Sequence, residues 1–348
     1  MSLLSFLKSL SLNIGIDLGT ANTVISIDND NIVLNEPSVV AMIEKKGEKI
    51  PYAFGLEAKK MLGKTPIKID VIKPLKDGVI SDFLTATEMI KFFIFKILKK
   101  RRSLFGPKII ICVPSGSTQV ERKAIQESAE ITGAREVFLI EETMAGAIGA
   151  DLDILEANGF MIIGIGGGTM EIGVLSLGEI IYSDSLRIAG DKFDEAIIDH
   201  IKKNFNLLIG SNTAEQIKFN VGNACFLDDD NEKTMEIFGR DLGSGIPIKM
   251  TIGEKEVSKA LYENINKIIE KIKSVLEIIP PELSTDINQK GIVLTGGGAL
   301  LKNFDYLISK TIGIKVVVAD KPLFSVINGI MKVFKEFSLY EKVLFKQM

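Results

Sequence analysis

The stretch that decides the fold is GFMIIGIGGGTMEIGVLSL, residues 159–177. Its apolar runs predict two buried strands, and the glycines between them predict a turn whose backbone is accessible. Such a turn is typical of a backbone that approaches a phosphate closely, because glycine has no Cβ to prevent the approach. Phosphate hydrolysis usually also needs a carboxylate that holds a metal ion, yet the first strand here ends at Gly164. The stretch therefore predicts a phosphate-binding loop that lacks an acid.

A second copy of this pattern lies near the N-terminus, where residues 14–27 read IGIDLGTANTVISI. Each copy is a strand, a turn with glycine and threonine, and a returning strand. The first copy ends its strand in Asp17, and the matching position of the second copy is Gly164. A repeat of this kind indicates two similar halves that hold a phosphate chain from both sides.

A third glycine loop, IVLTGGGALL at residues 292–301, follows a buried strand and is expected to open a helix. Any one of the three loops is more typical of an ordinary tight turn. Three loops together, two of them duplicated, favour a nucleotide site.

Composition narrows the class of protein. The 348 residues are 46% hydrophobic and 25% charged, which indicates an ordinary globular protein of roughly two domains. Strands alternate with helices, which favours an α/β architecture. The net charge of −3 provides no overall attraction to nucleic acid. Cys112 and Cys225 are predicted to be free thiols, and a single histidine, His200, argues against histidine-based catalysis and histidine metal sites.

Long matches to one family extend over nearly the whole chain. They include GIDLGTANT, VLNEPSVVA, PLKDGVISDF, VERKAIQESAEITGAREVFLIEE, GGGTMEIGVLSLG, RIAGDKFDEAI and GIVLTGGGALL. In these segments the chain resembles the MreB family of bacterial actin-like proteins. The resemblance implies an α/β actin-like ATPase fold, in which two duplicated ribonuclease-H-like domains, each with a smaller inserted subdomain, surround a nucleotide cleft. Domain I is expected at residues 1–155 and 324–348 with its insertion at about 41–75, and domain II at 156–323 with its insertion at about 192–257.

The resemblance also implies which residues bind ATP and Mg²⁺. Asp17 would hold the Mg²⁺ ion through water. The first phosphate loop would consist of Gly19, Thr20, Ala21 and Asn22, and the second of Gly166, Gly167, Gly168 and Thr169. The ribose and adenine side would be bound by Glu215, Gln216, Ile217 and Lys218. The adenosine loop would consist of Gly296, Gly297, Gly298 and Ala299.

Glu142 resembles the family's glutamate that orients the attacking water, with Thr169 assisting from the second loop. It stands just beyond the predicted strand EVFLI, at the carboxyl edge where ligands of α/β sheets bind. On the residues alone, Glu141 and Glu142 could equally favour the start of the next helix by their charge. The family match favours the catalytic role.

The chain departs from the family's pattern at three positions. Gly164 stands where the family has an aspartate, Thr143 where it has a proline, and Met170 where it has a second threonine. Gly164 removes one of two carboxylates beside the metal, so weaker Mg²⁺ binding and slower turnover are expected. ATP binding should survive, because its contacts are mostly made by the backbone. The altered loop and the absence of tryptophan resemble divergent family members from wall-less helical bacteria.

The resemblance implies a cytoplasmic protein, peripheral at the inner face of the cell membrane, that slowly hydrolyses ATP and forms paired filaments. Its role would be cell shape, or motility in wall-less cells. Its expected partners are itself, an anionic membrane surface and sister copies, without nucleic acid. Leu104 and Phe105 follow the basic residues 99–102, in a loop that dips into the membrane in this family. Val120, at a helix start, is a predicted contact between paired filaments.

Two alternatives use the same fold. One is a filament scaffold that binds nucleotide with impaired hydrolysis, an alternative that Gly164 keeps open. The other is a small-molecule kinase, which is disfavoured because no acceptor site is evident in the sequence.

Overall fold

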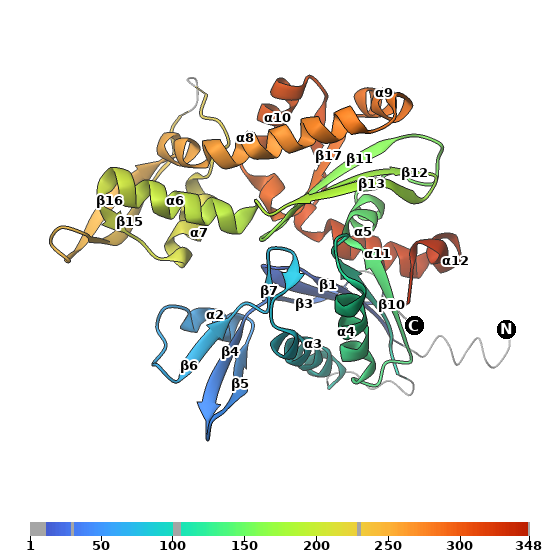
Figure 1. The fold of residues 1–348 in the computed structure, drawn as a ribbon, viewed down its shortest axis with the longest axis horizontal. Coiled ribbons are helices and arrows are strands. Elements are labelled where there is room, and N and C mark those ends of the chain that lie inside the picture. The colour runs from blue at the N-terminus through green and yellow to red at the C-terminus, as the bar shows by residue number, and fades with distance from the viewer. Residues whose placement is uncertain (1–11, 29–30, 100–105, 228–230, 347–348) are drawn as a thin grey trace. The chain divides into compact units, whose positions relative to one another are not determined.

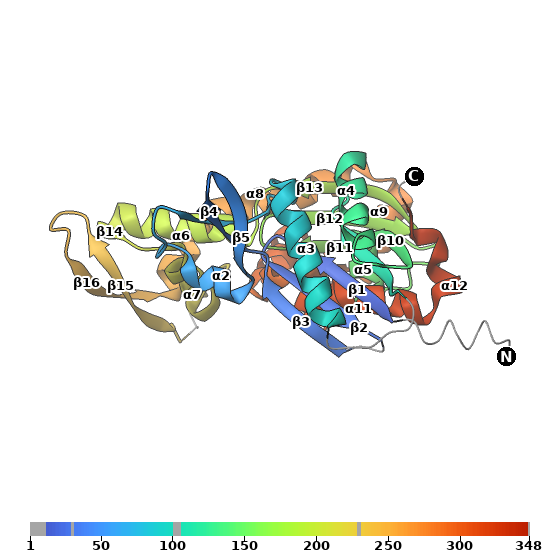
Figure 2. The same ribbon diagram turned by 90° about the horizontal axis from the view of Figure 1, so that it is seen from below.

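The structure, a computed structural model, describes residues 12–28, 31–99, 106–227 and 231–346. Figures 1 and 2 show its ribbon from two directions, coloured from blue at the N-terminus to red at the C-terminus. The chain divides into two compact units. Unit 1 consists of residues 1–157, 175–183 and 323–348, and unit 2 of residues 158–174 and 184–322. The finer division into four subdomains stays a prediction.

Five strands form the central sheet of unit 1: β1 (Asn13–Leu18), β2 (Asn22–Ile27), β3 (Asn31–Pro37), β9 (Lys108–Val113) and β10 (Glu136–Glu141). Their order in the sheet is β10-β9-β1-β2-β3. β1 is antiparallel to β2 and parallel to β9, so the sheet is mixed. The two strands predicted for the first copy of the repeat, and the predicted strand EVFLI, are therefore confirmed.

The helices of unit 1 cover both faces of this sheet, and β1 shows why. Successive strand residues point to opposite faces. Ile14 and Ile16 are buried in the cluster formed with α3 (Phe83–Leu98) and α4 (Gln119–Glu130). A Cβ on Gly15 would lie 2.8 Å from Ile330 of α11 (Ser325–Lys335), so Gly15 faces the other helix layer. Asp17 lies on the same face of the strand as Gly15.

The helix α5 (Glu142–Gly149) crosses α11 at very short range. A Cβ added to Gly149 would lie 1.7 Å from the Ser325 carbonyl oxygen, and one added to Gly329 would lie 1.8 Å from that of Ala145. Only glycine allows two helices to pack this closely, because any side chain would collide with backbone. The α5–α11 crossing therefore fixes the position of α5 within unit 1.

Local signals start the helices of unit 1. Thr118 and Glu121 form a capping box at α4: the Thr118 hydroxyl accepts from the Glu121 amide at 3.2 Å, and the Glu121 carboxylate accepts from the Thr118 amide at 2.7 Å. At α3, the Asp82 carboxylate accepts from the Thr85 amide at 3.0 Å. The side chains of Thr118 and Asp82 thus mark where α4 and α3 begin.

The remainder of unit 1 is a small antiparallel sheet, a two-stranded ribbon and the C-terminal elements. The sheet has the order β5-β4-β6 and packs on α2 around Val39, Ala41 and Ala58. The elements are β4 (Val40–Lys45), β5 (Glu48–Phe54), α2 (Leu56–Met61), β6 (Ile69–Ile72), β7 (Leu75–Lys76), β8 (Val79–Ile80), α12 (Phe337–Tyr340) and η3 (Glu341–Val343).

Unit 2 is built on a second five-stranded sheet: β11 (Phe160–Ile165), β12 (Met170–Ser176), β13 (Glu179–Leu186), β17 (Ile292–Thr295) and β18 (Val316–Val318). The order is β13-β12-β11-β17-β18, and residues 175–183 of the β12–β13 hairpin group with unit 1. The helices of unit 2 are α6 (Gly190–Phe205), α7 (Ser211–Val221), α8 (Glu254–Ile278), α9 (Pro281–Lys290) and α10 (Phe304–Ile312). The long α8 follows from apolar residues three and four positions apart, all buried: Val257, Leu261, Ile265, Ile268 and Ile272.

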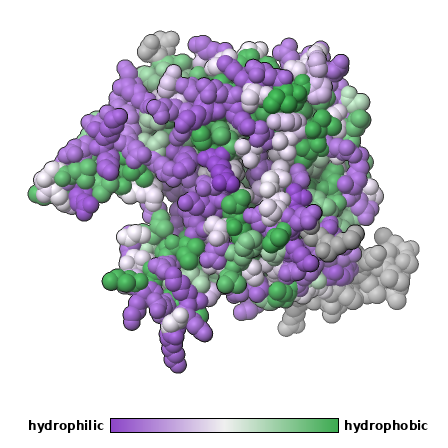
Figure 3. All heavy atoms as spheres, viewed as in Figure 1, coloured by the Kyte–Doolittle hydropathy of each residue, from purple (hydrophilic) through white to green (hydrophobic). Residues whose placement is uncertain are grey.

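A smaller sheet of unit 2 has the order β14-β15-β16, with β14 (Leu207–Leu208), β15 (Thr234–Asp241) and β16 (Pro247–Gly253). Four large apolar side chains are exposed on or beside its hairpin: Phe238, Leu242, Ile246 and Ile248. Figure 3 shows this apolar surface as green spheres at the β15–β16 hairpin.

Two expectations from the sequence concern the glycine loop after β17 and the two cysteines. The glycine loop after β17 was expected to open a helix, but it forms only the short 3-10 turn η1 (Gly297–Leu300), because its glycines favour helix weakly. Neither Cys112 nor Cys225 forms a disulfide among the described residues; Cys112 is buried, whereas Cys225 is half-buried. Within the described residues, no helix has both the length and the apolar character needed to cross a membrane.

Candidate functional site

The two phosphate loops predicted from the repeat close with the same hydrogen bond. In unit 1 the Gly19 amide donates to the Asn22 carbonyl at 3.1 Å, at the turn between β1 and β2. In unit 2 the Gly166 amide donates to the Thr169 carbonyl at 2.9 Å, at the turn between β11 and β12. Both loops are therefore four-residue turns closed by their first and last residues.

This shared turn identifies equivalent positions in the two copies. Asp17 and Gly164 each stand two residues before the glycine that closes the turn, and each is next to last in its strand. On the neighbouring parallel strand, Asp17 is paired with Cys112 and Gly164 with Thr295. The acid of the first loop is therefore replaced by glycine at the same place in the second.

Two carboxyl groups, those of Asp17 and Glu142, lie near each other in unit 1. Burial raises the pKa of Asp17 to about 7. Burial, and then the negative charge of Asp17, raise the pKa of Glu142 to about 8. Both side chains nevertheless keep part of their surface exposed to solvent. A carboxyl pair with these pKa values favours a bound cation, which would stabilise both anions.

The carboxylates of this pair suit Mg²⁺ better than a metal ion whose ligands all come from protein side chains. Within the described parts of the chain, no group of three or more histidine, cysteine, aspartate or glutamate side chains could hold a metal ion. Mg²⁺ usually takes only one or two carboxylates and completes its shell with water and phosphate oxygens. The carboxylate of Asp17 is suited to such a site.

In unit 2, the second phosphate loop is held by the start of α6. The Gly190 amide donates to the Gly166 carbonyl at 3.2 Å, and the Asp191 amide donates to the Gly167 carbonyl at 2.7 Å. The ammonium group of Lys218, on α7, donates to the Gly190 carbonyl at 2.9 Å. The loop and Lys218, predicted from separate segments, are thus brought together.

Lys218 also forms an ion pair with Asp194 of α6, at 2.8 Å, with only 14% of each side chain exposed. Burial raises the pKa of Asp194 to about 6, although the charge of Lys218 opposes the rise. The charge of Glu215 adds to the rise, so Glu215 lies near this pair. Sequence reasoning missed Asp194; the only signal was its place in the matched segment RIAGDKFDEAI.

The predicted adenosine loop adjoins the end of β11. Gly296 has φ 79° and ψ 170°, and a Cβ there would lie 2.4 Å from the Ile165 carbonyl oxygen. A Cβ on Gly298 would lie 2.2 Å from the Ile165 side chain. The two glycines therefore let this loop pack against the residue that precedes the second phosphate loop.

The other predicted residues vary in how accessible they are. Ala21, Asn22, Gln216 and Gly297 are exposed, whereas Ile217 and Ala299 are buried, so the side chain of Ile217 belongs to the core. Glu142 and the first loop belong to unit 1, and the other nucleotide residues to unit 2. The predicted membrane residues, Leu104 and Phe105, lie outside the described residues.

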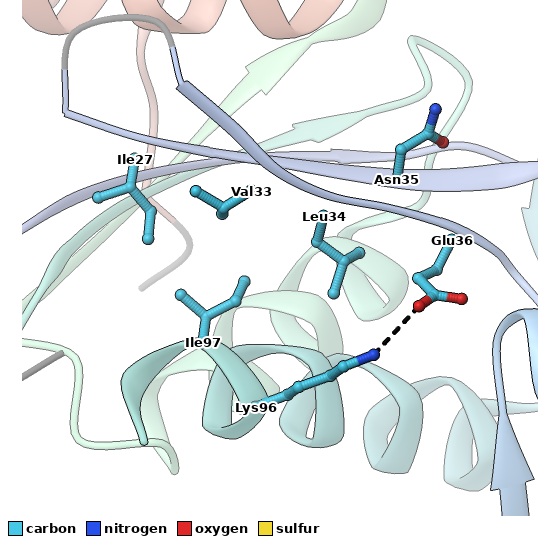
Figure 4. A pocket seen from close by; sticks show the side chains of 7 residues that line it. All are labelled: Ile27, Val33, Leu34, Asn35, Glu36, Lys96 and Ile97. Carbon is cyan, nitrogen blue, oxygen red and sulfur yellow. Dashed lines mark hydrogen bonds and ion pairs between the residues drawn. The ribbon is translucent and has the colours of Figure 1, made fainter. Parts of the chain in front are cut away.

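A pocket elsewhere in unit 1 contains none of these residues. Figure 4 shows it between the edge strand β3 and α3, lined by Ile27, Val33, Leu34, Asn35, Glu36, Lys96 and Ile97. Its two charged side chains pair with each other, since Lys96 lies 3.1 Å from Glu36. This pocket is mostly apolar and gives no support for phosphate chemistry.

Gly296→Ala should destabilise the protein by more than about 3 kcal/mol, because its backbone conformation is nearly restricted to glycine and the methyl group would meet Ile165 backbone. Gly313→Ala is the matched control, since Gly313 has φ 76° but open space around its Cβ position, and it should cost about 1 kcal/mol. Urea unfolding measures both. Equal losses in the two variants would show that packing against Ile165 is unimportant.

Nearly the whole chain is similar to one family of proteins. The family model described as MreB/Mbl protein matches residues 11–342. Cell shape-determining protein MreB of Escherichia coli is 47% identical over 337 residues, with 96% of each chain covered. Cell shape-determining protein Mbl of Bacillus subtilis is 46% identical, with 91% of this chain and 94% of that protein covered.

Solved structures give the same result. MreB5 of Spiroplasma citri bound to ADP superposes with a TM-score of 0.87 at 35% identity, covering 96% of this chain and 98% of that one. The MamK double helical filament matches with a TM-score of 0.77 at 21% identity, which supports the fold alone. The chain belongs to the MreB/Mbl family and has its actin-like ATPase fold.

Proposed function

We propose that this protein is an actin-like cytoskeletal ATPase that binds ATP with Mg²⁺, hydrolyses it slowly and polymerises into filaments that help determine cell shape. The observation that carries the proposal is the carboxyl pair of Asp17 and Glu142, beside a phosphate loop that recurs in unit 2. The relatives from E. coli and B. subtilis are named as cell shape-determining proteins, and Spiroplasma citri structures contain ADP or AMPPNP.

Each group of residues has its own role in this proposal. Backbone amides of the two turns bind the phosphates, and Lys218 with Glu215 binds the ribose and adenine side. Asp17 holds the hydration shell of Mg²⁺, and Glu142 orients the attacking water, with Thr169 assisting from the second loop. When bound, Mg²⁺ neutralises charge that develops on the phosphates.

Gly164 favours a second candidate function, a filament scaffold with impaired hydrolysis. It removes a carboxylate at the place where the first loop has Asp17. Phosphoryl transfer depends on positioning and on charge neutralisation, so the missing acid should slow the chemical step. A small-molecule kinase has less support, because no described feature suggests an acceptor site.

Self-association is supported by exposed apolar side chains. Val120, at the start of α4, is 72% exposed, and Phe238 of the β15–β16 hairpin is 68% exposed. Phe238 belongs to a group of four large exposed apolar side chains on or beside this hairpin, and contiguous apolar patches often mark protein–protein contacts. We infer that Val120 lies between paired filaments.

Membrane attachment is a further part of the proposal. Lys99 is exposed at the end of α3, next to the basic residues and the apolar pair, Leu104 and Phe105, that follow in the sequence. Anionic headgroups attract such basic residues while apolar side chains insert. We infer a peripheral location at the inner face of the cell membrane.

Sedimentation and electron microscopy should detect filaments in ATP with Mg²⁺. Glu142→Gln should bind ATP with unchanged affinity and hydrolyse it at least about 100-fold more slowly, because it removes the group that orients water. Glu127→Gln, an exposed change on α4, is the control and should behave like the wild type. The proposal fails if the wild type forms no filaments with ATP, or if Glu142→Gln hydrolyses ATP normally.

Gly164→Asp should raise the affinity for Mg²⁺ and speed ATP cleavage on the order of tenfold, because it restores a carboxylate at the end of β11. Cleavage and phosphate release should be measured separately, since a tighter metal could also slow release of the products. Gly116→Asp, exposed with open space around it, controls for an added charge. An unchanged Mg²⁺ dependence in Gly164→Asp would mean that this position does not serve the metal.

Liposomes that contain anionic lipid should bind the protein, and added salt should weaken the binding because it screens the basic residues. Replacing both Leu104 and Phe105 with serine should remove most of the binding, as measured by co-sedimentation. Liposomes of neutral lipid are the control. Unchanged binding by the double variant would place the membrane contact on another surface.

A further inference from the structure

The junction between β10 and α5 is held by an arginine that lies outside the predicted nucleotide site. Glu141 ends β10 and directly precedes Glu142, the first residue of α5. The Glu141 side chain does not cap α5. Its carboxylate instead accepts a hydrogen bond from the Arg122 guanidinium at 3.2 Å, with 26% of the glutamate and 19% of the arginine exposed.

Arg122 ties this junction to a second segment. Its guanidinium also donates to the Ser115 carbonyl at 3.3 Å, in the loop between β9 and α4. The Ser115 hydroxyl lies 3.2 Å from that of Thr143, which directly follows Glu142. The residues on either side of Glu142 are therefore both connected to the Ser115–Arg122 segment.

The C-terminal segment supports Arg122 from its other side. The Phe345 ring lies 4.8 Å from the Arg122 guanidinium carbon, at cation–π distance. Two backbone hydrogen bonds, at 2.9 and 3.1 Å, join Phe345 to Leu139 on the outer edge of β10. Arg122 Nε is buried and has no hydrogen-bond partner within the described part of the chain, so the ring supplies a contact that hydrogen bonds do not.

We infer that Arg122 is a positioning residue for the reaction proposed for Glu142, and that Phe345 of the C-terminal segment holds Arg122 in place. The inference rests on the proposed ATPase function. Arginine suits this task because its planar guanidinium reaches Ser115 and Glu141 together while it stacks on a ring. A residue that orients water must be held closely, since a misplacement of about 1 Å can cost roughly 100-fold in rate.

A structural role alone would give a different pattern of effects. If Arg122 only stabilised unit 1, its loss would lower the free energy of unfolding and leave the rate of the folded protein unchanged. If it positions Glu142, its loss lowers the rate of ATP cleavage at saturating ATP, while the Kd for ATP stays the same. The nucleotide contacts proposed above do not include Arg122. The cleavage rate can therefore change while the Kd for ATP stays the same.

The test measures single-turnover ATP cleavage and the Kd for ATP on the full chain. Arg122→Met should cleave ATP about 10- to 100-fold more slowly with a Kd within about twofold of the wild type. Arg122→Lys keeps the charge but not the planar fork, so its rate should fall between those of the wild type and Arg122→Met. Lys123→Met, an exposed neighbour on α4, removes the same charge and should leave both quantities unchanged.

Two further variants separate the partners of Arg122. Glu141→Gln should slow cleavage. The double variant with Arg122→Met should be no slower than Arg122→Met alone, because both changes break the same interaction.

Phe345→Tyr keeps the ring and should preserve the cleavage rate, whereas Phe345→Leu keeps apolar packing without the ring and should lower the rate several-fold.

The outcomes distinguish this inference from the proposed function. A wild type that binds ATP without cleaving it would overturn the proposed hydrolysis and this inference together. A wild type that cleaves ATP, with Arg122→Met cleaving it equally fast, would overturn this inference alone. Additive losses in the double variant would exclude a role for the contact between Arg122 and Glu141. Equal rates for Phe345→Leu and Phe345→Tyr would exclude a role for the contact between Arg122 and the Phe345 ring.

Discussion

The close crossing of α5 and α11 is the constraint on which the carboxyl pair of unit 1, Asp17 and Glu142, depends. Gly149 and Gly329 let the two helices pack backbone against backbone, so the start of α5 has little freedom to shift. α11 also covers the face of β1 to which Gly15 points, and Asp17 shares that face. Glu142 begins α5 and therefore stands near Asp17, close enough for the charge of Asp17 to raise its pKa. The backbone contact between α5 and α11 thus restricts how far Glu142 can move relative to Asp17.

Unit 2 uses a different means to hold its loop. Its second phosphate turn is fixed by backbone hydrogen bonds from Gly190 and Asp191, and Lys218 links the same segment to α7. None of these interactions uses the side chain at position 164. A change there can therefore alter the chemistry near the loop while the loop itself keeps its shape. This is the physical reason to expect that the loop keeps its backbone arrangement without a carboxylate at position 164.

Much of the fold and part of the site could be predicted from local sequence. Apolar runs identified the strands, and the repeat identified both turns, because a turn that closes on itself depends on only four neighbouring residues. The partners of Lys218 and Glu141 were not predictable in this way, since Asp194 and Arg122 come from other helices and meet them only through tertiary packing. The loop after β17 was expected to open a helix because its glycines follow a strand. Its glycines instead serve close packing against Ile165.

A glycine rather than an aspartate at position 164 affects two free-energy terms in opposite directions. Gly164 is half-buried near the end of β11, beside the buried Thr295. A carboxylate there would lose part of its hydration and, without a cation, would cost free energy. Glycine avoids that cost but raises the conformational entropy of the unfolded chain, which costs about 0.5–1 kcal/mol in a strand. Neither effect involves the backbone amides of the turn. The residue at position 164 can therefore vary without loss of the fold.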